Sequence, residues 1–244
     1  MMEQNAIKEQ VARAAVDALV KDGMKLGLGT GSTAIPAVRY IGALLKEGKL
    51  KNIRAVPTSF QTSIECEKWN IPLFSMNSKE IDGKLDLAID GADEVDPENR
   101  LIKGGGGAHL LEKIIAYASA SYAVVVDESK LVEYLCQKFP IPLEVIPEAR
   151  IPVTQALARL GAEVTLREAL RKAGPVITEH GNLLLDIRFG KAVDPEFMEF
   201  EINRIPRVVE NGLFTFPYAG DFRPVVFIGR PDGKVEQRFV RNNK

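Results

Sequence analysis

The sequence predicts an α/β protein built on a doubly wound, mainly parallel sheet, into which a smaller α+β subdomain is inserted. Two observations favour this fold. Short apolar segments alternate with segments of helical periodicity along the first 138 residues, and this alternation is typical of parallel sheets with helical crossovers. The alternation changes near residue 139, where Pro140, Pro142 and Pro147 interrupt it.

The first part of the chain is expected to alternate helix and strand. Ile7, Val11, Ala15 and Leu19 recur at a spacing of four residues and predict an amphipathic helix over 5–20. Further helices are expected at 34–45, 58–69 (capped by Thr58-Ser59) and 108–118, and strands at 24–28, 53–56, 72–75, 85–89 and 122–126.

Residues 139–205 are expected to form the inserted subdomain. Helices are expected at 153–160 and 197–205, a strand at 163–166, and a hairpin in which 176–178 and 183–189 flank a Gly181-Asn182 turn. Strands expected at 212–216, 225–229 and 235–240 would return to complete the first sheet. The main domain is therefore expected to comprise 1–138 plus 206–244.

The composition argues against several classes of function. The 32 Lys+Arg and 33 Asp+Glu give a formal net charge of −1, so the chain lacks the basic character of nucleic-acid-binding and membrane-surface proteins. No apolar run approaches the ~18 residues of a membrane span, and the polar N-terminus lacks a secretory signal. Two cysteines and two histidines favour a cytoplasmic protein without a disulfide framework or a His-rich metal site.

Glycines gather in three windows, the first of which is Gly27-Leu28-Gly29-Thr30-Gly31-Ser32-Thr33. It lies between an expected strand and an expected helix. Glycine lets the backbone approach a ligand closely, and the amides of a helix N-terminus favour an anion. The window is typical of a phosphate cradle, or of a tight turn capped by Ser32 or Thr33. Its spacing matches neither a Walker loop nor a dinucleotide fingerprint.

The second window is Asp90-Gly91-Ala92-Asp93-Glu94-Val95-Asp96, directly after an expected strand. Ligands bind beyond the carboxyl ends of strands in such sheets, where carboxylates can orient hydroxyl groups or move protons. We therefore expect a functional role for Asp90, whereas Glu94, Asp96 and Glu98 fit a solvated acidic turn better.

The third window is Lys103-Gly104-Gly105-Gly106-Gly107. Four glycines in succession cost backbone entropy on folding, and Lys103 offers a cation for a carbonyl oxygen or a developing oxyanion. Glu112 falls about one turn into the following helix. We interpret His109 as a structural or surface residue and Lys113 as a surface charge.

Together these windows predict an anion cradle, two aspartates, a lysine and a glutamate. This set of groups suits proton transfer beside a carbonyl in a phosphorylated, hydroxyl-rich substrate. Lys130, which follows the strand at 122–126, is either a surface lysine or a further contact to phosphate or hydroxyl.

Several stretches, in this order, carry a likeness to a known family. They are Gly29-Thr30-Gly31-Ser32-Thr33-Ala34, Asp90-Gly91-Ala92-Asp93-Glu94, Lys103-Gly104-Gly105-Gly106 with Glu112-Lys113, Asp127-Glu128-Ser129-Lys130, residues 139–147, and Pro231-Asp232-Gly233. Across nearly its whole length the chain resembles ribose-5-phosphate isomerase of the A type.

The resemblance implies a Rossmann-like catalytic domain and a ferredoxin-like inserted subdomain that lies at the interface of a homodimer. It also implies cofactor-free interconversion of D-ribose 5-phosphate and D-ribulose 5-phosphate in the non-oxidative pentose phosphate pathway. It implies that Glu112 moves a proton between C2 and C1 and that Asp90 assists ring opening. Asp93 and Lys103 would bind and polarise the reacting oxygens. The substrate-binding residues that it implies are Lys8, Thr30, Gly31, Ser32, Thr33, Gly91, Ala92, Gly104, Gly105, Gly106 and Lys130.

Other functions fit these motifs less well. A sugar-phosphate-sensing domain of the same fold would keep the cradle without needing a base, and it remains the alternative, although Glu112 and Lys103 are both present. A coenzyme A transferase needs a glutamate nucleophile in its own signature, which the chain lacks. An inactive relative is disfavoured because every polar position of the motifs is intact.

Overall fold

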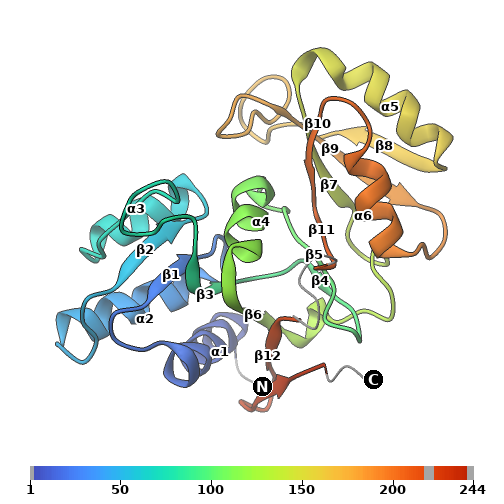
Figure 1. The fold of residues 1–244 in the computed structure, drawn as a ribbon. Coiled ribbons are helices and arrows are strands. Elements are labelled where there is room, and N and C mark those ends of the chain that lie inside the picture. Colours follow the sequence, from blue (N-terminus) through green and yellow to red (C-terminus); the bar gives the residue numbers. More distant parts are fainter. Residues whose placement is uncertain (1–2, 217–222, 241–244) are drawn as a thin grey trace. The chain divides into compact units, whose positions relative to one another are not determined.

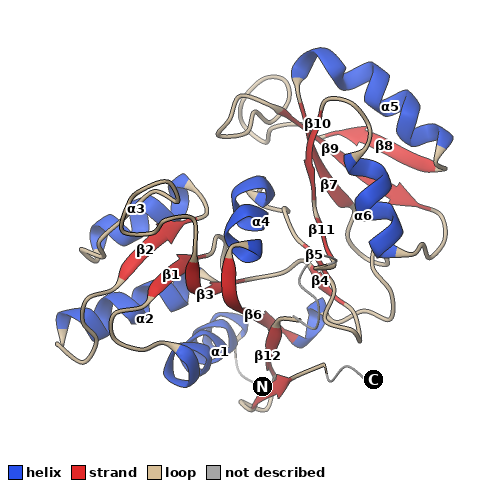
Figure 2. Ribbon diagram, viewed as in Figure 1, coloured by secondary structure: helices blue, strands red, loops and turns tan. Residues whose placement is uncertain are grey.

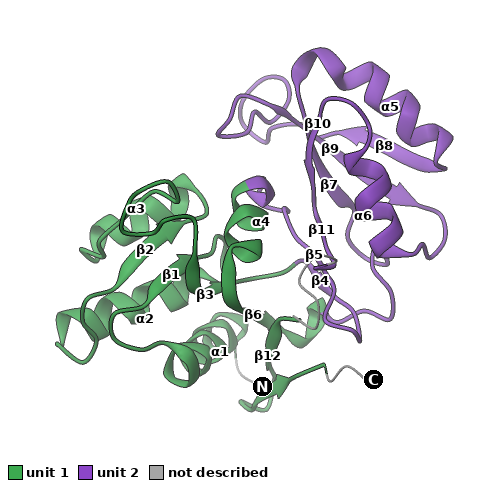
Figure 3. Cartoon of the chain, viewed as in Figure 1, with its two compact units in different colours: residues 1–92, 111–130, 219–244 green, residues 93–110, 131–218 purple. Residues whose placement is uncertain are grey.

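The chain divides into two compact units. The computed structural model describes residues 3–216 and 223–240. The first unit comprises residues 1–92, 111–130 and 219–244, and the second comprises 93–110 and 131–218 (Figure 3).

The first unit is built on a six-stranded sheet in the order β13-β12-β6-β3-β1-β2 (Figure 1). All neighbouring strands are parallel except β13, which is antiparallel to β12. The strands are β1 (Lys25–Leu28), β2 (Arg54–Pro57), β3 (Leu85–Asp90), β6 (Ser119–Asp127), β12 (Val225–Gly229) and β13 (Val235–Arg238). The predicted mainly parallel sheet is thus confirmed.

Helices cover both faces of this sheet, as a doubly wound fold requires (Figure 2). They are α1 (Gln4–Leu19), α2 (Ile35–Lys46), α3 (Phe60–Lys68) and α4 (His109–Tyr117). On one face Leu26 and Leu28 of β1 join a core with residues of α1 and α2. Gly27 points to the other face, where an added Cβ would lie 2.3 Å from Ile115 of α4.

The strand order creates a switch point between β1 and β3. The chain leaves β1 for β2 on one side, and β3 lies on the other. The carboxyl ends of β1 and β3 are directly adjacent, because the Gly29 N–H donates to the Ile89 carbonyl at 2.9 Å. Open parallel sheets bind ligands at such a place.

The second unit contains a four-stranded antiparallel sheet in the order β10-β7-β9-β8. Its elements are β7 (Ile141–Val145), α5 (Arg150–Arg159), β8 (Ala162–Leu166), β9 (Leu183–Phe189), α6 (Pro195–Asn203) and β10 (Val208–Asn211). Both helices pack on one face, where Val153, Leu157, Met198 and Ile202 join the core. A small sheet joins β4 (Glu94–Val95), β5 (Leu101–Ile102) and β11 (Leu213–Phe214).

Several predicted elements differ from the observed ones. Residues 141–145 form a strand despite Pro142, which precedes Leu143, the first residue of β7 that pairs with β10. Pro142 takes part only as an acceptor, from the Gly212 N–H at 2.8 Å, a role that proline can fill. The expected strands at 72–75 and 176–178 are reduced to isolated bridges at Leu73 and Ile177. The segment 212–216 contributes β11 to the small sheet, and only β12 and β13 return to the first sheet.

Two 3-10 helices complete the description, at Glu128–Lys130 and Pro147–Ala149. Within the part of the chain that the structure describes, no helix has both the length and the apolar character needed to cross a membrane. The expected division of the chain at residues 139 and 205 stays a prediction.

Candidate active site

The first two sequence windows meet at the carboxyl ends of β1 and β3. Asp90 is the last residue of β3 and is almost fully buried. Its Oδ1 accepts hydrogen bonds from the Thr30 N–H at 3.1 Å and from the Gly91 N–H at 2.8 Å. The hydrogen bond from Thr30 shows that the loop after β1 holds the Asp90 carboxylate in place.

Glycine is required at position 29 by this close approach. A Cβ added there would lie 2.1 Å from the Asp90 Oδ1 and 2.6 Å from the Asp90 Cα. Glycine is needed at position 31 for a different reason, because its φ of +91° is a backbone conformation that residues with side chains rarely adopt.

A cluster of hydroxyl groups from the start of α3 supports the same loop. The Thr30 Oγ1 lies 2.6 Å from both the Thr58 Oγ1 and the Ser59 Oγ, and 3.1 Å from the Thr62 Oγ1. Sequence reasoning identified Thr58-Ser59 as a helix cap, and the Ser59 Oγ does accept from the Thr62 N–H, but the support of Thr30 was missed. The available signal was that these residues follow β2, the neighbour of β1.

The part of the loop that is expected to bind an anion lies where α2 begins. The N-cap of α2 is Ala34, with no hydrogen bond from a side chain, so the alternative of a turn capped by Ser32 or Thr33 is wrong. The Lys8 Nζ donates to the Ser32 Oγ at 2.8 Å, which puts a cation beside the helix N-terminus. A helix terminus, a hydroxyl and an ammonium together suit a phosphate.

Glu112 lies in the first turn of α4 and is 5% exposed. The neighbouring Lys113 is 4% exposed, with its Nζ 5.9 Å from the centre of the Tyr117 ring. The interpretation of Lys113 as a surface charge is therefore wrong, because α4 buries both charged residues.

Lys130 ends the 3-10 helix that follows β6. The buried Asp127 ends β6, and both the hydroxyl and the N–H of Ser129 donate to its carboxylate. Burial alone would raise the pKa of Asp127, but these hydrogen bonds and the charge of Lys130 outweigh it and hold the pKa below its ordinary value.

In the second unit, Asp93 is fixed by the glycine-rich loop. The Gly105 N–H donates to the Asp93 Oδ2 at 2.7 Å, and a Cβ on Gly105 would lie 2.7 Å from the Asp93 Oδ1. Lys103 is 2% exposed, with its N–H donating to the Gly212 carbonyl and its Nζ 5.6 Å from the centre of the Phe214 ring.

The other acidic residues of the second window have structural contacts. Glu94 is buried and accepts hydrogen bonds from the N–H groups of residues 136, 138 and 139. Asp96 is buried and pairs with Arg100 at 2.6 Å. The expectation of a solvated turn is therefore wrong for both, although Glu98 is exposed.

His109 is fully buried, and its Nε2 lies 3.1 Å from the Glu210 carbonyl. A Cβ on Gly104 would lie 2.8 Å from the imidazole. The structural interpretation of His109 is thus supported by close packing against the glycine loop.

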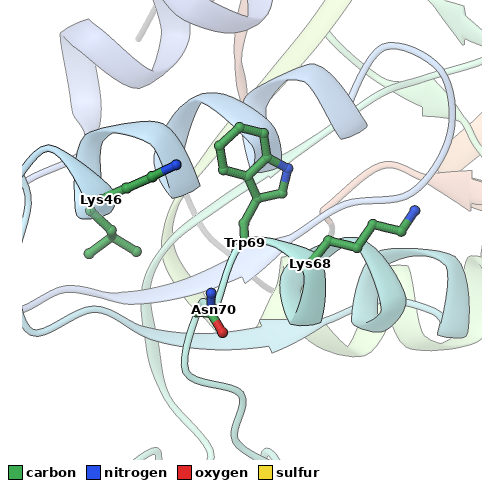
Figure 4. Close-up of a pocket in the computed structure, with 5 residues that line it drawn as sticks. Lys46, Lys68, Trp69 and Asn70 are labelled. Carbon is green, nitrogen blue, oxygen red and sulfur yellow. The ribbon is translucent and has the colours of Figure 1, made fainter.

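The candidate residues are divided between the two units. Lys8, residues 29–34, Asp90 and Glu112 belong to the first unit, and Asp93 and Lys103 belong to the second. A pocket of about 600 Å³ lined by Leu45, Lys46, Lys68, Trp69 and Asn70 includes none of them (Figure 4). Among residues 3–216 and 223–240, no group of three or more His, Cys, Asp or Glu could hold a metal ion.

Comparisons with known proteins give consistent results. A family model described as ribose 5-phosphate isomerase A (phosphoriboisomerase A) matches residues 54–233. A protein of Treponema denticola named ribose-5-phosphate isomerase A is 53% identical over 242 residues, covering 96% of this chain and 99% of that protein. A protein of the same name from Thermosynechococcus vestitus is 51% identical over 243 residues, covering 98% and 99%.

Solved structures agree with these sequence matches. The structure of ribose 5-phosphate isomerase A from Methanocaldococcus jannaschii has a TM-score of 0.89 and 44% identity, covering 98% of this chain and 100% of that one. A D-ribose-5-phosphate isomerase in complex with phospho-erythronic acid has a TM-score of 0.89 and 41% identity, covering 97% and 100%.

Proposed function

The chain belongs to the ribose 5-phosphate isomerase A family, and from that premise we propose how its residues interconvert D-ribose 5-phosphate and D-ribulose 5-phosphate. The main support for this activity is the sequence identity of 53%, over 96% of this chain, to a relative named ribose-5-phosphate isomerase A. The reaction moves a proton between C2 and C1 through an enediolate, so the site must bind a phosphate, open the sugar ring, and supply a base and an oxyanion partner.

The phosphate binds at the start of α2, with Lys8, Ser32 and Thr33 as its partners. The contact between Lys8 and Ser32, at 2.8 Å, and the absence of a side-chain cap on α2 support this assignment. Lys130 is a further contact to the substrate.

Asp90 assists ring opening by acting on the anomeric hydroxyl or on the ring oxygen. Its place at the carboxyl end of β3 and its two backbone donors support this role, because those donors fix the orientation of the carboxylate beside the ligand-binding edge of the sheet. Gly91 and Ala92 allow the substrate to approach the backbone beside it.

Glu112 is the base that takes the proton from C2 and returns it to C1. Asp93 and Lys103 bind and polarise the two oxygens between which the carbonyl moves, with Gly104, Gly105 and Gly106 beside them. The burial of both Glu112 and Lys103 supports these roles, since charges act more strongly where water is excluded.

The decisive experiment is a coupled assay for ribulose 5-phosphate with the purified chain, in the presence of EDTA. We expect turnover, and we expect Glu112→Gln to lower kcat by about two to four orders of magnitude, the usual scale for removal of a general base. Glu67→Gln, at an exposed glutamate of α3, is the matched control and should leave kcat unchanged. Near-normal activity of Glu112→Gln would reject Glu112 as the base.

The alternative of a sugar-phosphate-sensing domain has a distinct outcome in the same experiment. Such a protein would bind ribose 5-phosphate, measured by calorimetry, with no ribulose 5-phosphate formed. The high identity to proteins named as isomerases over nearly the full chain favours catalysis.

We also propose a cytoplasmic homodimer in which residues 139–205 lie at the interface. Phe197 and Phe200 on α6 are 58% and 53% exposed, and paired exposed aromatic side chains are typical of interaction surfaces. Light scattering should give twice the chain mass, and the double variant Phe197→Asp, Phe200→Asp should give the mass of a single chain.

The two cysteines are free and buried, which fits the reducing compartment of the proposed cytoplasmic location. Cell fractionation tests this location.

A further inference from the structure

Arg167 makes an unusual set of contacts in the second unit. It follows β8, and its Nε and Nη2 donate to the two carboxylate oxygens of Asp186 on β9, at 2.9 and 2.5 Å. Its Nη1 donates to the carbonyl oxygens of Gly104 and Gly105, at 3.0 and 3.2 Å. One guanidinium thus joins the four-stranded sheet to the glycine-rich loop.

The position of Arg167 is itself fixed by the backbone. Its N–H donates to the Leu184 carbonyl and its own carbonyl accepts from the Val176 N–H, both at 2.9 Å. The Arg167 side chain is 15% exposed and the Asp186 side chain 22%. Because a bidentate pair held at both ends is geometrically specific, the direction of the Nη1 toward the loop is set by the sheet.

The peptide group between Gly104 and Gly105 links Arg167 to Asp93. Its carbonyl oxygen accepts from Arg167, and its N–H donates to the Asp93 Oδ2 at 2.7 Å. Gly104 has a φ of +100° and, like Gly105, lacks the side chain that would restrict rotation of this peptide. A charged donor on the carbonyl also strengthens the N–H as a donor.

We propose that Arg167 is a positioning residue for the isomerase reaction, acting on Asp93 through the Gly104–Gly105 peptide. The proposal rests on the proposed function, in which Asp93 binds a reacting oxygen. Arg167 prevents the peptide from rotating, so that its N–H keeps the Asp93 carboxylate in one orientation. Asp186 in turn fixes the guanidinium. Lysine cannot replace the arginine, because a single ammonium lacks the planar fork that serves the carboxylate and the carbonyls together.

The first test compares Arg167→Ala and Arg167→Lys with the unaltered chain in the isomerase assay. We expect kcat to fall by up to about 100-fold in both variants, the scale of a misplaced catalytic group, with KM changed by less than about threefold. Guanidinium ion at millimolar concentration should restore part of the kcat of Arg167→Ala. Arg39→Ala is the matched control, because Arg39 also pairs with a carboxylate, that of Glu65 at 2.7 Å, and it should leave kcat unchanged.

The second test asks whether Arg167 acts through Asp93. In an Asp93→Ala background the addition of Arg167→Ala should change kcat by less than about threefold, since the group that Arg167 positions is gone. If the kcat of the double variant were instead lowered by the product of the two single losses, the proposal would be overturned. Unchanged kcat in Arg167→Lys, or an effect of that substitution on KM alone, would also overturn it. If Arg167→Ala does not fold, Arg167→Lys replaces it throughout.

A third measurement separates this inference from the proposed function. In the NMR spectrum of Arg167→Lys, the Gly105 amide proton should shift and lose its protection from hydrogen exchange, whether or not the chain is an active isomerase. An unaltered Gly105 amide would overturn the inference while leaving the proposed function intact. Absence of isomerase activity in the unaltered chain, with the Gly105 amide perturbed as expected, would reject the function and the catalytic part of the inference.

Discussion

Replacement of Gly29 by alanine should lower both the stability and the activity of this enzyme. The added Cβ would lie 2.1 Å from the Asp90 Oδ1 and 2.6 Å from the Asp90 Cα, which is far inside van der Waals contact. The second of these atoms belongs to the backbone and cannot turn away as a side chain can. The Gly29 N–H is bonded to the Ile89 carbonyl at 2.9 Å, so relief of the overlap must pull the ends of β1 and β3 apart.

Overpacking of a well-ordered region costs about 1–3 kcal/mol of unfolding free energy. For a chain of this size that corresponds to a decrease in Tm of about 2–12 °C. Displacement of Asp90 should also weaken its contact with the Thr30 N–H, and we expect kcat for ribose 5-phosphate to fall about 100-fold. Calorimetry and the coupled assay measure the two effects.

Gly190→Ala is the matched control for this substitution. A Cβ at Gly190 meets no atom within 4 Å, and the residue has no positive φ. It should therefore change neither Tm nor kcat appreciably. If Gly29→Ala proved as stable and as active as Gly190→Ala, the argument that β1 and Asp90 are held together by close contact would be refuted.

Three further predictions concern buried side chains. Burial raises the pKa of the Cys66 thiol to about 12, so iodoacetamide at pH 8 should alkylate Cys66 only after unfolding; labelling of the native chain at the rate of a free thiol would contradict this. The Arg39 hydrogen bond holds the pKa of Glu65 below its usual range, so the stabilisation is present above the unfolded pKa and is lost as the pH falls through the folded pKa. The Tm difference between Arg39→Gln and the unaltered chain should accordingly shrink from pH 7 to pH 3, and a constant difference would reject the pairing. Glu94→Ala leaves three backbone N–H groups without their acceptor and should cost at least about 3 kcal/mol of unfolding free energy, measured by urea denaturation, whereas a loss below about 1 kcal/mol would contradict this role.

The parallel sheet and its helices could be predicted because their signals are local. Apolar spacing identified the helix near Ile7 and the strand near Leu87. The predicted Thr58-Ser59 cap includes Ser59, which does cap α3. Each of these features depends on residues a few positions apart, where periodicity and capping chemistry act directly.

The environment of the charged residues could not be predicted in the same way. Glu94 belongs to an acidic run that is usually solvated, yet it is buried, because the donors that satisfy it come from residues 136–139. Lys113 is likewise buried on α4. Composition cannot distinguish an exposed carboxylate from a buried one whose partners lie far along the chain.

The sequence by itself determined the type of sheet, the family resemblance and the windows that carry the candidate chemistry, since these are properties of residue type and spacing. Tertiary structure decided which of those residues are fixed by hydrogen bonds and which distant residues make those bonds. Thr30 meets Asp90 across 60 positions and Arg167 meets Gly105 across 62. Such contacts form only when strands distant in sequence pair, because register and packing, rather than local propensity, set the distances between their side chains.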